Sequence, residues 1–171
     1  VGIGLGWLYI KSTNKFYKKR LLPEEIDDLI FYTSFGAVIG GRIGYCLFYD
    51  LNSIILNPLL VFAIWNGGMS FHGGLLGIII ATILFSNKRG FDKLLLLDIV
   101  SCVAPIGIFF GRLANFVNGE LYGKPTDLPW AVTFPLVDDQ GRHPSQIYEA
   151  FLEGVLLFII LQFIVRKMSY K

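Results

Sequence analysis

The sequence predicts an all-α fold, a polytopic bundle of helices that cross a membrane. Of its 171 residues, 54% are hydrophobic and only 16% are charged, a balance that is typical of membrane proteins. The apolar residues are gathered into runs of about 20, the length that a helix needs to cross about 30 Å of hydrocarbon. The basic residues lie in short clusters between these runs. A net charge of +2 without a basic stripe gives no indication of a nucleic-acid partner.

Four apolar runs are long enough to span a bilayer, and part of a fifth opens the chain. They cover 29–48, 68–86, 94–112 and 145–165, with 1–10 as the end of the first. The chain begins in mid-run without a methionine and stops just after another run. We therefore expect a single membrane-embedded domain over 1–171 that is truncated at both ends.

Two further segments connect these spans. The apolar stretch 54–65 is too short to span and contains Pro58, so we expect it to lie in the membrane interface or to re-enter the membrane, with Trp65 at headgroup level. Segment 113–144 is rich in glycine, proline and aromatic residues, which favours a small ordered cap over a linker.

The basic clusters also predict the orientation of the chain. Eleven of the fifteen lysines and arginines lie in 11–28, 87–93 and 166–171. These are alternate connections, and positively charged loops stay on the cytoplasmic side. The cap segment 113–144 is therefore expected on the outer face.

Most polar side chains of the spans are expected at their outer ends. Ionisable groups within a bilayer cost a few kcal/mol or more, so they usually face a cavity or one another. Asp98, near the cytoplasmic end, and Glu153, deeper in its helix, are exceptions. The group at the outer ends comprises Arg42, His72, Arg112, Asn115, Asn118, Glu120, His143, Gln146 and Glu149.

This group has the chemistry of a phosphate site at the depth of lipid headgroups. Arginine forms forked, charge-assisted hydrogen bonds to phosphate, and an imidazole can take a proton from a nucleophile near neutral pH. Each residue alone could equally serve packing or interhelical hydrogen bonding. The flanking glycines fit close helix packing or the approach of a lipid headgroup.

We expect neither of the two cysteines of the chain, nor a metal ion, to take part in this chemistry. Cys46 and Cys102 stand alone in apolar runs, as small buried hydrophobic residues do. No cluster of carboxylates or of cysteine and histidine has the spacing of metal ligands, so we expect no metal and no cofactor.

Four stretches resemble one known family, in the same order along the chain. GRLANFVNGELYG at 111–123 resembles the signature of the prolipoprotein diacylglyceryl transferases. GGRIGYCLFY at 40–49, GGMSFHGGLLG at 67–77 and RHPSQIYEAFLEG at 142–154 resemble the same family. The resemblance implies an enzyme of the bacterial inner membrane whose site faces the outer leaflet. Such an enzyme moves the diacylglyceryl group of phosphatidylglycerol to the lipobox cysteine in a prolipoprotein signal peptide, and glycerol phosphate is released.

The resemblance also assigns roles to residues. His72, Arg112 and Glu120 are expected to act catalytically, with His72 as the base. Phosphatidylglycerol is expected to contact Arg42, Arg112, Asn115, Asn118 and Gly123. Supporting roles fall to Asp98, His143, Gln146, Tyr148 and Glu149. The family has further spans and a C-terminal arginine that this chain lacks, so the chain alone is expected to be inactive.

Two rival functions remain open at this point. A non-enzymatic helix bundle for anion conduction or transport could line its path with Arg42, His72 and Arg112. The one-sided placement of the polar groups and the lack of an internal repeat disfavour it. An enzyme with the same phosphate pocket could instead serve a hydroxyl acceptor, and only the resemblance distinguishes a thiol from a hydroxyl.

Overall fold

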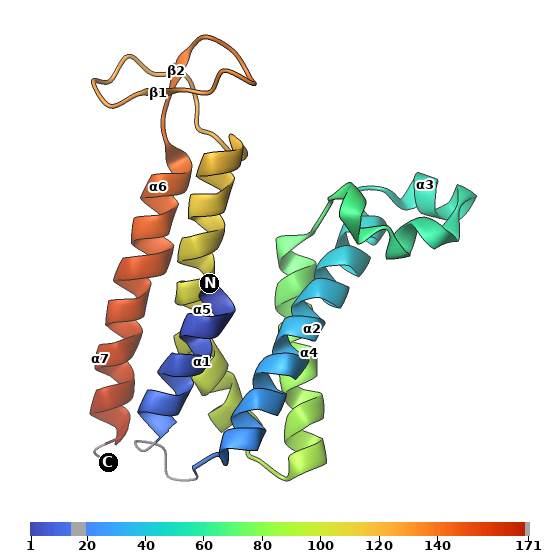
Figure 1. Cartoon of the computed structure of the whole chain (residues 1–171), viewed down its shortest axis with the longest axis vertical. Helices are drawn as coiled ribbons and strands as arrows, with labels where there is room; N and C mark the ends of the chain where they lie inside the picture. Colours follow the sequence, from blue (N-terminus) through green and yellow to red (C-terminus); the bar gives the residue numbers. More distant parts are fainter. Residues whose placement is uncertain (15–19, 170–171) are drawn as a thin grey trace. The chain divides into compact units, whose positions relative to one another are not determined.

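The computed structural model describes residues 1–14 and 20–169, and these are mostly helical (Figure 1). Two compact units are present: Leu21–Asp98 forms one, and Val1–Arg20 with Ile99–Lys171 forms the other. The all-α fold class is therefore confirmed. Lys15, Lys18 and Lys19, which contributed to the predicted orientation, lie outside the described residues, as does Lys171.

Three helical stretches among the described residues are long and apolar enough to cross a membrane. They are α4 (Phe71–Arg89), α5 (Lys93–Asn118) and the stretch Ser145–Val165. They correspond to three of the four predicted full spans. The fourth lies in α2 (Pro23–Phe48), which is long enough at 26 residues but is less apolar, because it carries charged residues in its first turns and Arg42 near its end.

Helix α2 begins at Pro23, before the predicted span 29–48, because the residues at its start favour a helix N-terminus. Pro23 occupies the first turn of the helix, where its missing N–H costs no hydrogen bond. The Glu25 carboxylate accepts a hydrogen bond from the Leu22 N–H at 2.7 Å, so it caps a donor that the helix leaves free.

Helices α2 and α4 lie side by side and touch through backbone atoms (Figure 1). Gly36, Gly40 and Gly44 recur at every fourth residue of α2 and face Gly73 and Gly77 of α4. A Cβ atom at Gly44 would lie 2.8 Å from the Gly73 Cα, and one at Gly40 would lie 2.8 Å from the Gly77 Cα. Such contacts exclude any side chain, so these glycines serve close helix packing.

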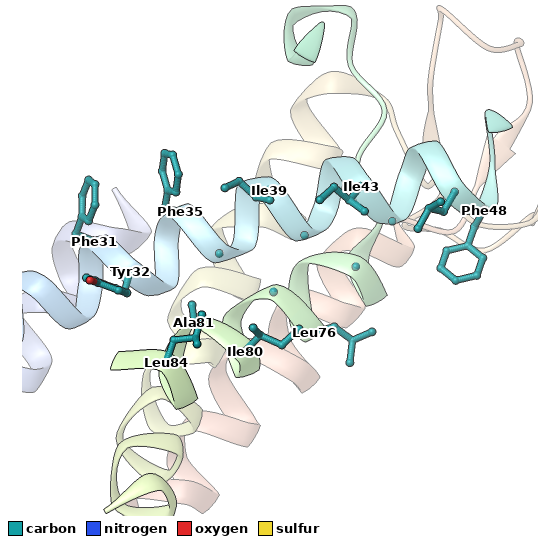
Figure 2. Close-up of a pocket in the computed structure, with 16 residues that line it drawn as sticks. Phe31, Tyr32, Phe35, Ile39, Ile43, Phe48, Leu76, Ile80, Ala81 and Leu84 are labelled. Carbon is teal, nitrogen blue, oxygen red and sulfur yellow. The ribbon is translucent and has the colours of Figure 1, made fainter. Parts of the chain in front are cut away.

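An apolar groove of about 560 Å³ runs along this helix pair (Figure 2). Side chains of both helices, including Phe35 and Ile39 of α2 and Ile80 of α4, lie along it, and the glycines form part of its lining. The groove exists because the glycines bring the two backbones together while the larger side chains on either side stand away from the contact.

The connection between α2 and α4 consists of three short helices. These are α3 (Leu51–Leu56) and the 3₁₀ helices η2 (Pro58–Phe62) and η3 (Ile64–Asn66). Gly67 and Gly68 follow with φ of 77° and 78°, in the region that favours glycine. Helix α4 therefore begins at Phe71, three residues later than predicted.

The other unit packs three helical stretches together. Helix α1 (Gly2–Thr13) contacts α5, where Gly6 meets Val103. The last stretch comprises α6 (Ser145–Glu149), the π-helix η4 (Ala150–Leu156) and α7 (Leu157–Ser169). Gly154 of η4 lies against Phe109 of α5.

Helix α5 continues six residues beyond the predicted end of its span. It ends where Gly119 adopts φ of 68°, so the predicted cap segment starts with two helical turns. The remaining cap carries the antiparallel strands β1 (Val132–Thr133) and β2 (Gly141–Arg142) (Figure 1). Buried Phe134 meets the Phe116 ring edge-on at 5.9 Å, which anchors the cap to α5.

The glycine contact predicts that Gly77→Ala destabilises the protein. The new Cβ would lie 2.8 Å from the carbonyl carbon of Gly36, and overpacking of this kind costs about 1–3 kcal/mol. Thermal unfolding of the detergent-solubilised protein, followed by circular dichroism, measures the effect. Gly107→Ala is the matched control, because no atom lies within 4 Å of its added Cβ. Equal stability of the two variants would contradict the packing role.

Candidate functional site

The end of α5 forms a clasp with the residues that follow it. The Asn115 side-chain amide donates to a Glu120 carboxylate oxygen at 3.0 Å. The Glu120 backbone N–H donates to the Asn115 carbonyl at 2.8 Å. The left-handed turn at Gly119 allows this reversal of the chain. The structure therefore brings together two signature residues that the sequence placed five positions apart.

A second contact joins this turn to α6. The buried Gln146 side chain donates to the Glu120 carbonyl at 2.6 Å, and its other polar atom, Oε1, has no partner among the described residues. The Gly123 N–H donates to the His143 carbonyl at 3.0 Å. A Cβ at Gly123 would lie 2.7 Å from that same oxygen. Glycine is required here because the two chain segments approach too closely for a side chain.

Arg112 is held between two carboxylates of the last helical stretch. Its Nε lies 2.9 Å from Glu149 Oε2 and its Nη2 lies 3.2 Å from Glu153 Oε2. The Arg112 side chain is 24% exposed, against 36% for Glu149 and 48% for Glu153. Arg112 and Glu149 were both predicted site residues, whereas Glu153 was regarded as lying apart from the site.

A chain of hydrogen bonds connects the cap to α6. The Trp130 indole N–H donates to the Tyr148 hydroxyl at 2.7 Å, and that hydroxyl lies 3.3 Å from His143 Nδ1. Indole can only donate, so the Tyr148 hydroxyl oxygen accepts from Trp130. Tyr148 and His143 thus support the cap together, with Trp130 as a partner that the sequence did not reveal.

An ion pair in the cap shifts the pKa of both its members. The hydrogen bond from Arg142 lowers the pKa of the Asp138 carboxyl, and the same bond raises the pKa of Arg142. Arg142 also donates to the Gly123 carbonyl at 3.2 Å and lies over the Tyr122 ring. The guanidinium therefore holds the loop and the end of the signature together.

Arg42 lies in the other unit and is surrounded by backbone carbonyls. It is buried, and its Nε donates to Val61 at 3.1 Å. Its terminal nitrogens donate to the carbonyls of Leu60, Gly67 and Gly68. In this structure the guanidinium satisfies the carbonyls of the irregular connection between α2 and α4. A contact of Arg42 with phosphatidylglycerol stays a prediction.

His72 is exposed in the first turn of α4. Ser70 caps this helix, and its hydroxyl accepts from the Gly73 N–H at 3.3 Å. The Phe71 ring meets the imidazole edge-on at 5.7 Å. His72 and Arg42 thus belong to one compact unit and the signature residues to the other. The predicted convergence of the two groups stays a prediction.

The remaining predicted residues have fewer contacts. Asn118 is exposed at the end of α5 and lines a small hollow of about 290 Å³ with cap residues. Asp98 is exposed on α5, and no ion pair of its carboxylate occurs within the described residues. Cys46 and Cys102 are both buried, and neither forms a disulfide within the described residues. In the described part of the chain, no group of three or more His, Cys, Asp or Glu is arranged to hold a metal ion.

Glu153 and Trp130 are the partners that sequence reasoning missed. Arg112 and Glu153 are 41 positions apart on different helices, and no periodicity relates them. A signal did exist within the last span, because Glu149 and Glu153 are four residues apart and so lie on one face of a helix. Two like charges on one face of an apolar span require a cation opposite them.

Comparison with known proteins relates the whole chain to one family. The family model described as prolipoprotein diacylglyceryl transferase matches residues 1–171. Relatives named phosphatidylglycerol–prolipoprotein diacylglyceryl transferase include that of Rhizobium meliloti, 48% identical over 99% of this chain and 63% of its own length. Those of Mesorhizobium japonicum and Allorhizobium ampelinum are 51% and 53% identical, over 95% and 86% of this chain and 59% and 51% of their own lengths.

The chain thus spans about 60% of the length of the first two of these relatives. The family model covers residues 1–171 and so includes the signature at the end of α5. The chain belongs to the prolipoprotein diacylglyceryl transferase family.

Proposed function

We propose that the full-length protein transfers the diacylglyceryl group of phosphatidylglycerol to the lipobox cysteine of prolipoproteins. Membership of the family supports this activity, and the names of the relatives give the two substrates. The observation that carries the proposal is the clasp at the end of α5, where Arg112, Asn115, Glu120 and Gly123 of the signature lie within one short stretch of chain.

The chemistry needs an anion site and a means of activating a thiol. The thiol sulfur attacks the carbon of the diacylglyceryl unit that is bonded to the phosphate oxygen. A carbon–sulfur bond forms, and the bond between that carbon and the phosphate oxygen breaks. Glycerol phosphate leaves with the bonding electrons, so fixed cations that meet its growing charge lower the barrier. Arg112 is suited to this role because guanidinium forms forked bonds to phosphate.

We propose that His72 is the base that takes the proton of the thiol. A free thiol has a pKa of about 8.5 and is mostly protonated at neutral pH, so a base speeds the attack. The exposed position of His72 in the first turn of α4 leaves its ring accessible to a substrate. This role requires His72 to lie close to Arg112 and the other signature residues in the full-length protein.

The site is assigned to the outer leaflet of the bacterial inner membrane. Basic residues gather in alternate connections, and Lys88 and Arg89 near the end of α4 lie opposite its His72 end. Positive connections stay in the cytoplasm, and this supports an outer position for His72 and the cap. A prolipoprotein signal peptide with its lipobox cysteine would reach such a site from the membrane.

The proposal is tested by transfer in vitro with the purified full-length protein. Labelled phosphatidylglycerol is mixed with a lipobox peptide, and a peptide with serine in place of the cysteine is the control. We expect lipidated cysteine peptide and an equal amount of released glycerol phosphate. A folded protein that releases no glycerol phosphate would contradict the proposal, and modification of the serine peptide would indicate a hydroxyl acceptor.

Arg112→Ala is expected to lower transfer by about 10²–10³-fold, the usual effect of removing one group that stabilises a developing anion. The same assay measures the loss. Arg89→Ala is the matched control, because Arg89 forms an exposed ion pair with Asp28 and has no part in the proposed site. Comparable activity of the two variants would remove Arg112 from the phosphate site.

His72→Gln distinguishes a base from a residue that only orients the headgroup. Glutamine can still form hydrogen bonds but cannot take the proton, so we expect transfer at pH 7 to fall by about 10²–10⁴-fold. Activity should recover as the pH rises past about 8.5, where the thiol ionises by itself. A variant that keeps most of its activity at pH 7 would assign His72 to headgroup binding.

A further inference from the structure

Carboxylates contact two of the three nitrogens of the Arg112 guanidinium. Its Nε faces Glu149 and its Nη2 faces Glu153, at 2.9 and 3.2 Å. Among the described residues, no hydrogen bond to Nη1 is found. Nη2 carries two N–H groups, so Glu153 takes one of them and the other stays available beside Nη1. A phosphate that takes two parallel hydrogen bonds from an arginine needs both nitrogens of one edge.

The charges around Arg112 also oppose an anionic ligand. Two carboxylates and one guanidinium give the cluster a net charge of −1. A phosphodiester that approached the intact cluster would meet an excess of negative charge. The departure of one carboxylate would remove this excess of negative charge and leave Arg112 better suited to bind phosphate.

The two carboxylates are not equally placed to leave. Glu149 pairs with Nε at 2.9 Å, is the less exposed of the two, and precedes the π-helix directly. Glu153 pairs with the terminal Nη2 at 3.2 Å, and nearly half of its side chain is exposed. It lies inside η4 (Ala150–Leu156), and π-helical turns occur frequently at functional sites.

We propose that Glu153 is a positioning residue that pairs with Nη2 of Arg112 until an anionic lipid phosphate replaces it. Glu149 stays on Nε and keeps the guanidinium oriented. The departure of Glu153 frees both N–H groups of Nη2, which together with Nη1 forms the fork for the phosphate. This inference rests on the proposed function, since it takes the lipid phosphate as the ligand of Arg112. The carboxylate lowers affinity for the lipid and keeps the partly buried cation paired while the site is empty.

Steady-state kinetics of Glu153→Gln and Glu153→Ala in the full-length protein test the exchange. Both variants remove the competing charge, so we expect the KM for phosphatidylglycerol to fall by about two- to five-fold, the range that partly exposed ion pairs support. The kcat should not rise. A residue with only a structural role would leave KM unchanged or raise it, and that result in a folded variant would overturn the proposal.

Glu149→Gln is the matched control, because it removes a carboxylate of the same length from the same arginine. Here Arg112 loses its orientation, so kcat is expected to fall and KM is not expected to improve. An equal drop in KM for Glu149→Gln would overturn the assignment of the exchange to Glu153.

A measurement of phosphatidylglycerol binding tests the exchange at Arg112 independently of the transfer activity. The wild-type protein and Glu153→Gln are placed in nanodiscs of phosphatidylcholine with a small fraction of phosphatidylglycerol, and native mass spectrometry measures the lipid that each retains. We expect the variant to retain more phosphatidylglycerol. If the wild type catalyses no transfer, the proposed activity fails, while equal retention by both proteins would overturn the exchange itself.

Discussion

Polar groups on long apolar helices must find partners within the protein, because hydrocarbon offers none. Arg42 and Arg112 meet this constraint in different ways. Arg42 donates to the carbonyls of an irregular connection, whereas Arg112 is paired with two carboxylates. The first arrangement uses the cation to complete the backbone structure. The second keeps the cation in a pair that an anion can replace.

The helices could be predicted from the sequence better than their ends. Runs of apolar residues identified α4, α5 and the last stretch, because about 20 such residues suffice to cross a bilayer. Single residues decide where each helix ends. Gly67 and Gly68 delay α4 through their positive φ, and Gly119 ends α5 only after the two turns that carry Asn115 and Asn118. Hydropathy does not contain this information, since it averages over many residues.

The site was predictable where its residues are close in sequence. The clasp of Asn115 and Glu120 lies within one signature, and the contact of Gly123 with His143 joins two stretches that resemble the same family. The pairing of Arg112 with Glu153 depends instead on how two distant helices face each other. The sequence also could not distinguish the two uses of arginine, because both residues follow a glycine in an apolar run.

The carbonyls around Arg42 have a consequence for how the chain enters a membrane. The partners of this guanidinium belong to residues 60–68, which follow α2 and precede α4. A newly inserted α2 would therefore carry an unpaired cation, at a cost of a few kcal/mol, until the connection has folded. The glycine contact between α2 and α4 brings the ends of that connection together. Biogenesis is thus expected to insert the two helices as one hairpin, with the arginine hydrogen-bonded to backbone carbonyls before the hairpin enters the lipid.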